Sequence, residues 1–107
     1  MPAMKTVITS SGDTLQSTMD PRFGRCAYFC VYDHESGATT FEKNEFADAM
    51  GGAGQKVAEK MLTLGVKRVV SGDFGPKAKE LLDKYQVQLV KFSEDHKTIQ
   101  QIIETLK

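Results

Sequence analysis

The sequence of 107 residues contains only two cysteines, three prolines and no tryptophan, and neither sign of charge is in excess. Two cysteines are too few for the disulfide framework of a small secreted domain, so we treat both as reduced thiols. Fourteen basic residues against fourteen acidic ones leave no net positive field for a polyanion. The composition therefore argues against nucleic acid as a partner.

The sequence also lacks any apolar run near the roughly 20 residues that span a bilayer. Its start, Met1 to Lys5, does not have the apolar stretch of a signal peptide. We therefore expect a cytoplasmic protein that does not bind membranes. The length and the 40% hydrophobic content suit one globular domain over residues 1–107, with 1–4 as a leader.

Apolar periodicity predicts five strands, at 5–10, 27–33, 39–43, 66–71 and 87–92. Three helices follow the last three strands of this order. The first begins after the glycines at 51–54 and ends at Gly65, and the second begins at Pro76 and turns Tyr85 inward. Ser93 or Asp95 is expected to cap the third.

This order suits a three-layer α/β domain with a mixed sheet. Right-handed crossovers make the last two strands parallel, and a hairpin beside the first strand leads to the sheet order 3-2-1-4-5. Three segments then converge at the carboxyl edge of the sheet: 11–27, 44–54 and 71–76. Ligands of open α/β sheets bind at such an edge.

The expected edge has features that favour a negatively charged ligand. Two helices begin there after glycines that expose backbone N–H groups, and helix amino termini attract anions. Arg22 and Arg25, two of the three arginines in the chain, lie in the long loop at the same edge. None of the glycine runs has the spacing of a nucleotide fingerprint, so the ligand class stays open at this point.

The two cysteines are four residues apart, which on one strand places them on one face about 13 Å apart. At that separation they cannot chelate a single metal ion. Cys30 is read as a core residue. Cys26 lies beside Arg25, and a nearby cation favours the thiolate, so Cys26 is either a ligand or reactive thiol or a structural residue.

Catalytic arrangements are poorly supported. His34 and His96 are expected at the surface, away from this edge, and no nucleophile, base and orienting group can be assembled. The loop carboxylates are weak support for a two-metal nuclease, because they lie in loops and the first strand carries none of them. These carboxylates are Asp13, Asp20, Asp48 and Asp73. We expect that the protein is not an enzyme.

Three motifs resemble the dinitrogenase iron-molybdenum cofactor biosynthesis family. They are Asp20-Pro21-Arg22-Phe23-Gly24-Arg25-Cys26 followed by Tyr28-Phe29, then Gly51-Gly52-Ala53-Gly54, and then Gly72-Asp73-Phe74-Gly75-Pro76-Lys77-Ala78. The resemblance implies a ribonuclease H-like fold with the same 3-2-1-4-5 sheet. Members of the family include carriers of nitrogenase cofactor precursors and a protein that holds a molybdenum-copper sulfide cluster.

Carried over by motif, the resemblance implies a set of residues that contact the cofactor, with Cys26 as the metal ligand. The set is Arg22, Phe23, Gly24, Arg25, Cys26, Gly51, Gly52, Ala53, Gly54, Gly72, Asp73, Gly75 and Pro76. Dedicated nitrogenase carriers often add a histidine, which this edge lacks, and one chain cannot supply the four thiolates of a conventional iron-sulfur cluster. A cluster would therefore arrive preformed, held largely by hydrogen bonds and charge, or be shared between subunits.

The leading hypothesis is a carrier for an anionic metal-sulfur cluster or cofactor precursor, either iron-sulfur or molybdenum-containing. Its partners would be the proteins that donate and accept the cluster. Two alternatives stay open: an interaction or regulatory domain that uses loop 11–26 without metal, and a divalent-metal phosphohydrolase that uses Asp13 and Asp73.

Overall fold

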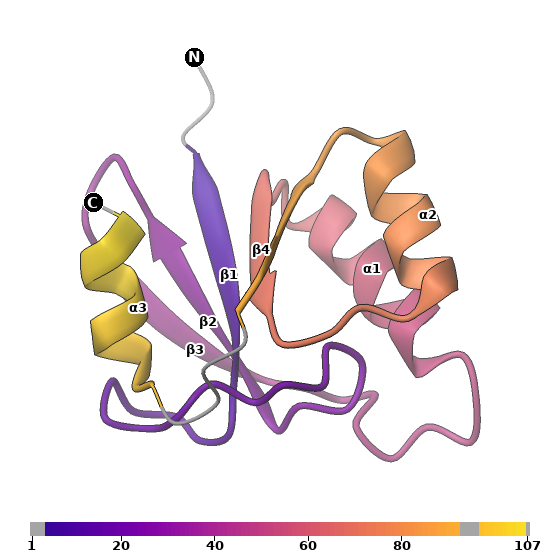
Figure 1. Cartoon of the computed structure of the whole chain (residues 1–107), viewed down its shortest axis with the longest axis horizontal. Coiled ribbons are helices and arrows are strands. Elements are labelled where there is room, and N and C mark those ends of the chain that lie inside the picture. Colours follow the sequence, from indigo (N-terminus) through magenta and orange to yellow (C-terminus); the bar gives the residue numbers. More distant parts are fainter. Residues whose placement is uncertain (1–3, 93–96, 107) are drawn as a thin grey trace.

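The computed structural model describes residues 4–92 and 97–106, which form one mixed sheet and three helices (Figure 1). The strands are β1 (Lys5–Ser10), β2 (Tyr28–Asp33), β3 (Thr39–Lys43), β4 (Arg68–Ser71) and β5 (Gln88–Lys91). The helices are α1 (Ala53–Thr63), α2 (Pro76–Lys84) and α3 (Ile99–Leu106). Within this part of the chain, no helix is long and apolar enough to cross a membrane.

The sheet has the order β3-β2-β1-β4-β5. β1 pairs antiparallel with β2 and parallel with β4, while β5 extends the parallel half. The hairpin of β2 and β3 completes the antiparallel half. The predicted α/β fold and the predicted strand order are therefore confirmed.

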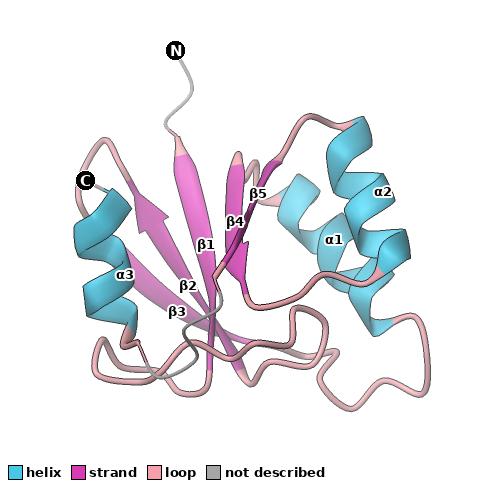
Figure 2. Ribbon diagram, viewed as in Figure 1, coloured by secondary structure: helices cyan, strands magenta, loops and turns pink. Residues whose placement is uncertain are grey.

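Both faces of the sheet are covered, which makes three layers (Figure 2). Side chains alternate between faces along a strand, so neighbouring residues of β1 enter different cores. Val7 lies in the core that the sheet forms with α1 and α2, and Ile8 lies in the core under α3. Central strands that are buried on both faces need apolar residues at successive positions, as β1 and β4 have.

Capping residues in the local sequence set the end of α1 and the start of α3. At the end of α1, Gly65 has a φ of 73°, and its N–H donates to the carbonyl of Leu62 while that of Val66 donates to Met61. This is the predicted glycine cap. At the start of α3, Thr98 and Gln101 form a reciprocal capping box. The caps predicted at Ser93 and Asp95 lie outside the described residues.

One prediction for the core is wrong. Tyr85, expected to face inward, is 54% exposed. Helix α2 ends at Lys84, and Tyr85 is the residue that ends it, with backbone angles that leave the helical region. The helical period that buries Ala78 and Leu82 therefore does not extend to Tyr85.

Candidate functional site

The structure brings the three loop segments together at the edge where β1 and β4 end, along the lower side of Figure 1. The side-chain amide of Asn44 donates to the carbonyls of Gly24 and Cys26, at 3.1 and 2.8 Å. A backbone bridge joins Arg22 to Asp73. Segments that are distant in sequence are thus connected by direct contacts at this edge.

A cavity of about 350 Å³ lies where these segments meet the first turns of α1 and α2. Its lining contains two cationic side chains and no acidic one. The lining residues are Gly24, Arg25, Gly52, Ala53, Gly54, Gln55, Gly75, Pro76, Lys77 and Ala78. The charge and the small residues make this cavity suited to a compact anion.

Backbone N–H groups at the start of the two helices add to the positive character of the cavity. The N–H groups of a first helical turn have no partner within the helix. Gly52 precedes α1 and Gly75 precedes α2, and neither provides a side-chain cap. Residues of both first turns line the cavity, so the positive ends of the two helix dipoles lie beside it, although α2 offers fewer N–H donors because its first residue is Pro76.

Two glycines permit the close approach of the loops. A Cβ on Gly24 would lie 2.7 Å from the nitrogen of Gly54, and one on Gly72 would lie 2.6 Å from Cα of Pro21. Any side chain at these positions would force the backbones apart. Gly24 and Gly72 are therefore needed for the packing of the edge itself.

The two arginines of the loop are separated by the fold. Arg25 lines the cavity, and its Nη1 donates to the carbonyl of Ala47 at 3.1 Å and also to that of Ala49. Arg22 does not line it and instead pairs with Asp20 through a hydrogen-bonded ion pair at 3.0 Å. This pairing raises the pKa of Arg22. The sequence predicts both arginines at the same site because they lie in one loop, and it does not indicate the direction of either side chain.

Two aromatic rings pack together beneath the loop. Phe23 is buried in the core, and its ring centroid lies 5.3 Å from that of Phe74. Tilted aromatic pairs at this separation contribute packing energy beyond area burial. The contact between Phe23 and Phe74 thus holds the loop against the core.

The expectation that Arg25 favours a Cys26 thiolate is wrong for this conformation. Cys26 is fully buried, and burial raises its pKa to about 12, with the nearby Asp20 carboxylate acting in the same direction. Arg25 directs its guanidinium to loop carbonyls instead. Cys26 therefore carries a protonated thiol that donates to the Phe23 carbonyl at 3.5 Å.

The two cysteines also do not share a face. Cys26 belongs to the core under α1 and α2, and Cys30 to the core under α3. The strand β2 begins only at Tyr28, so the alternation of side chains does not extend back to Cys26. Cys30 is a fully buried core residue, as predicted.

Chelating side chains are scarce. Among the described residues, no group of three or more histidines, cysteines or acidic residues is placed to hold a metal ion. Asp73 is exposed and lies 3.6 Å from the Lys91 ammonium. His34 contacts the hydroxyl of Thr6 at 2.7 Å, at the opposite end of β1, and His96 lies outside the described residues. The donor set fits a preassembled anion held by N–H groups and cations, and it does not fit a bare metal ion.

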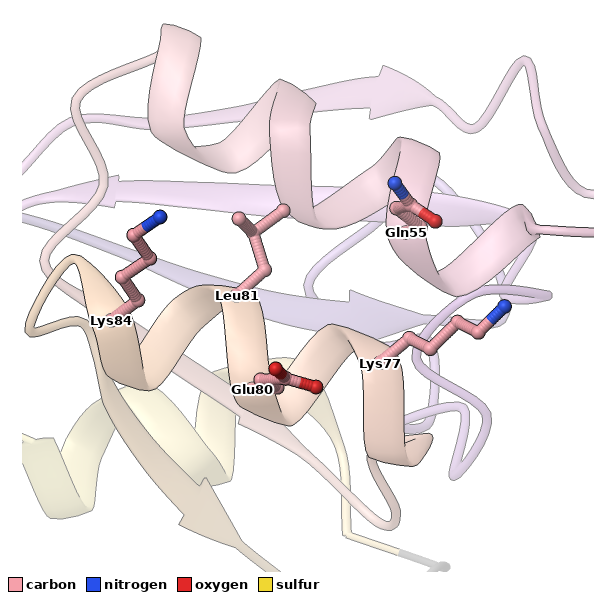
Figure 3. A pocket seen from close by; sticks show the side chains of 5 residues that line it. All are labelled: Gln55, Lys77, Glu80, Leu81 and Lys84. Carbon is pink, nitrogen blue, oxygen red and sulfur yellow. The ribbon is translucent and has the colours of Figure 1, made fainter.

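A second depression, of about 340 Å³, lies between α1 and α2. Figure 3 shows the side chains that line it, with Gln55 on α1 and the rest on α2, namely Lys77, Glu80, Leu81 and Lys84. Gln55 and Lys77 line both this groove and the cavity, so the two are continuous. Sequence reasoning assigned no site role to either residue, although Lys77 lies within the third glycine motif.

These features define a three-layer α/β domain with a glycine-lined cavity at the carboxyl edge of its sheet. The family model described as dinitrogenase iron-molybdenum cofactor matches residues 4–107. The chain therefore belongs to this family. No curated protein matches the sequence significantly.

Solved structures agree with this assignment. The apo form of the orange protein from Desulfovibrio gigas has 26% identity and a TM-score of 0.89, and the match covers 98% of this chain and 88% of that one. A Thermotoga protein, provisionally described as a NifB protein, has 33% identity and a TM-score of 0.81, with 96% and 86% covered. The fold is thus shared across nearly the full length.

Proposed function

We propose that the protein binds a preformed, anionic metal-sulfur cluster or a precursor of an iron-molybdenum type cofactor and carries it without catalysing a reaction. The observation that carries this proposal is the cavity, whose lining combines two cations, two helix amino termini and no carboxylate. Membership in the dinitrogenase iron-molybdenum cofactor family supports the same cargo class.

Charge and hydrogen bonds would provide most of the affinity. Arg25 and Lys77 are the two charged groups of the lining, and hydrogen bonds from charged donors are about twice as strong as neutral ones. Backbone N–H groups of the first helical turns would contact sulfide or oxo groups. A cargo held this way needs few side-chain ligands, which suits an edge with one cysteine and no described histidine.

Cys26 would supply at most one covalent bond to the cargo. Its thiol is buried under the loop and protonated in this conformation. Ligation would therefore require release of the contact with the Phe23 carbonyl and loss of the thiol proton, both of which a metal centre favours. The other motif residues would shape the cavity or hold its loops.

The test is anaerobic titration with tetrathiomolybdate, a small molybdenum sulfide dianion, followed by absorption spectroscopy and elemental analysis. Wild-type protein is expected to bind it stoichiometrically. Arg25→Gln and Lys77→Gln are each expected to weaken binding about tenfold, because each removes a charged donor. A charge-transfer band that is lost in Cys26→Ala would identify the ligand.

The matched control is Arg68→Gln, which removes the third arginine from the start of β4, at the opposite edge of the sheet. It is expected to bind like wild type. Equal weakening in Arg68→Gln would mean that only net charge matters. No uptake by the wild-type protein would contradict the proposal.

One observation favours a second candidate, a docking site for a protein. The groove between α1 and α2 adjoins the cavity and is lined by Lys77, Lys84 and Glu80 beside a half-buried Leu81 (Figure 3). Proteins that donate or accept the cargo would have to reach the cavity, and this groove adjoins it. The test is the rate at which Lys84→Glu transfers cargo to an acceptor protein. A wild-type rate, with cargo binding unchanged, would contradict this candidate.

A further inference from the structure

The glycines that line the cavity do not all have the same reason to be glycine. They are Gly24, Gly52, Gly54 and Gly75. Gly24 is needed for packing, because a Cβ there would lie 2.7 Å from a backbone nitrogen of α1. Gly52 has a φ of 68°, which lies in the left-handed region that other residues rarely adopt. The fold itself therefore accounts for these two.

Gly54 has neither of these reasons. It is the second residue of α1, and its φ is not in the left-handed region. A Cβ on Gly54 would lie 3.6 Å from the Cβ of Ala78, which is an ordinary van der Waals distance. Alanine would therefore fit, and it favours a helix more than glycine does because it loses less backbone freedom on folding. Glycine is thus the less stable choice here for the fold alone.

The space that Gly54 leaves lies between two facing walls. Ala78 belongs to α2 and also lines the cavity, so a methyl group on Gly54 would stand between the first turns of the two helices. Gly75 differs in this respect, because a Cβ there would meet no atom within 4 Å. Among the lining glycines, Gly54 is the one whose missing side chain keeps a gap between α1 and α2 open.

This gap is at the inner end of the cavity. Ala78 is buried and Gly54 is half-buried, whereas the cationic residues Arg25 and Lys77 are exposed. An anion drawn in by the two cations would therefore reach the gap with its most deeply placed group. The N–H groups of the first turn of α1 lie beside that group.

We propose that Gly54 sets the size of the cargo, by leaving room for one terminal sulfide or oxo group between the first turns of α1 and α2. This inference rests on the proposed function. The group would pack on the backbone at Gly54 and on the methyl group of Ala78. Gly54 contributes space and no charge, so it limits which anions enter without adding to the attraction between protein and cargo.

The test is Gly54→Ala, which adds one methyl group where the cargo would lie. Tetrathiomolybdate is expected to bind about tenfold to a hundredfold more weakly than to wild type, because the methyl overlaps a terminal sulfide. The Tm without cargo is expected to equal that of wild type or to exceed it by up to about 5 °C, since alanine suits the helix. Wild-type affinity in Gly54→Ala would overturn the proposal.

Gly51→Ala is the matched control. Gly51 precedes the same helix, a Cβ there meets nothing within 4 Å, and it is not among the described residues that line the cavity. It is expected to bind tetrathiomolybdate like wild type. Equal weakening in Gly51→Ala would mean that any methyl group in this glycine run disturbs the site, and it would overturn the size role.

Salt dependence separates lost space from lost charge. Arg25 and Lys77 remain in Gly54→Ala, so the affinity is expected to fall with added salt as steeply as in wild type. A shallower dependence would mean that the substitution displaced a cation, and it would overturn the proposal.

The Tm measured without cargo keeps the two proposals distinguishable. A Gly54→Ala variant that melts well below wild type would mean that the fold needs this glycine, and it would overturn the size role alone. A stable variant together with no uptake of tetrathiomolybdate by wild type would contradict the proposed function and, with it, the size role.

Discussion

Cys26 shows how a single residue changes its chemistry when the chain folds. Beside Arg25 in sequence it resembles an activated thiol, but in the structure it is surrounded by the core under α1 and α2. Asn44 approaches its sulfur from one side, at 3.9 Å, and donates to its carbonyl. Desolvation of the thiol, with the Asp20 carboxylate acting in the same direction, therefore outweighs the attraction of Arg22 for a thiolate and raises the pKa of Cys26.

This burial predicts a loss of stability at high pH. The pKa of both thiols is raised from 9.0 to about 12 by burial. A raised folded-state pKa means that the contribution to stability is complete below pH 9 and is lost as the pH rises toward 12. The loss is about 1.4 kcal/mol per pH unit for each thiol.

Urea unfolding at pH 8, 9.5 and 10.5 measures this slope. Cys26→Ala is expected to be less stable at each pH, because packing is lost, but to have a shallower slope than wild type. Val57→Ala, a packing control in the same core, is expected to keep the wild-type slope. Equal slopes in Cys26→Ala and wild type would contradict the burial of the thiol.

At the scale of elements, the edge that contains the cavity depends on close contacts between backbone segments. Loop 20–26 lies against the first turn of α1 through Gly24 and against the end of β4 through Gly72. The hydroxyl of Ser71 contacts the Pro21 carbonyl at 3.5 Å and so connects β4 to the same loop. The loop is therefore a packed part of the domain.

Gly24→Ala is expected to destabilise the protein by about 1–3 kcal/mol, because the added methyl would overlap backbone that cannot easily move. Gly51→Ala is the matched control, since a Cβ there meets nothing within 4 Å. It should change stability by no more than about 0.5 kcal/mol. Chemical denaturation measures both, and equal effects would contradict the close packing of the loop on α1.

At the scale of the whole molecule, the charges balance overall and yet are unevenly placed. The chain has no net charge, but the cavity lining carries two cations and no acid. Local charge at a concave site can attract an anion without a net basic protein. The positive charge thus belongs to the cavity at one edge and not to the chain as a whole.

Binding of cargo to the folded state alone should stabilise the whole domain. At a free tetrathiomolybdate concentration one hundred times its Kd, we expect about 2.7 kcal/mol of added stability. For a domain of this size that corresponds to a Tm increase of about 10 to 20 °C. Calorimetry measures it, with sulfate as a control of equal charge, and a shift of the same size with sulfate would contradict selectivity for sulfide.

The sequence by itself determined the order of elements, the sheet order and the three segments that meet at the edge. These follow from apolar periodicity, glycine and proline positions and the handedness of crossovers, which are properties of short segments and their connections. The glycine cap at Gly65 is equally local. The capping box of Thr98 was also readable and was missed in favour of residues further upstream.

Only the tertiary structure decided which side chains reach the cavity. It placed Arg25 and Lys77 in the lining, turned Arg22 toward Asp20 and buried Cys26. Neighbours in a loop lack a fixed period, so their directions depend on what packs against them from distant segments. The physical reason is that burial and pairing energies arise between residues far apart in sequence, and no local pattern records them.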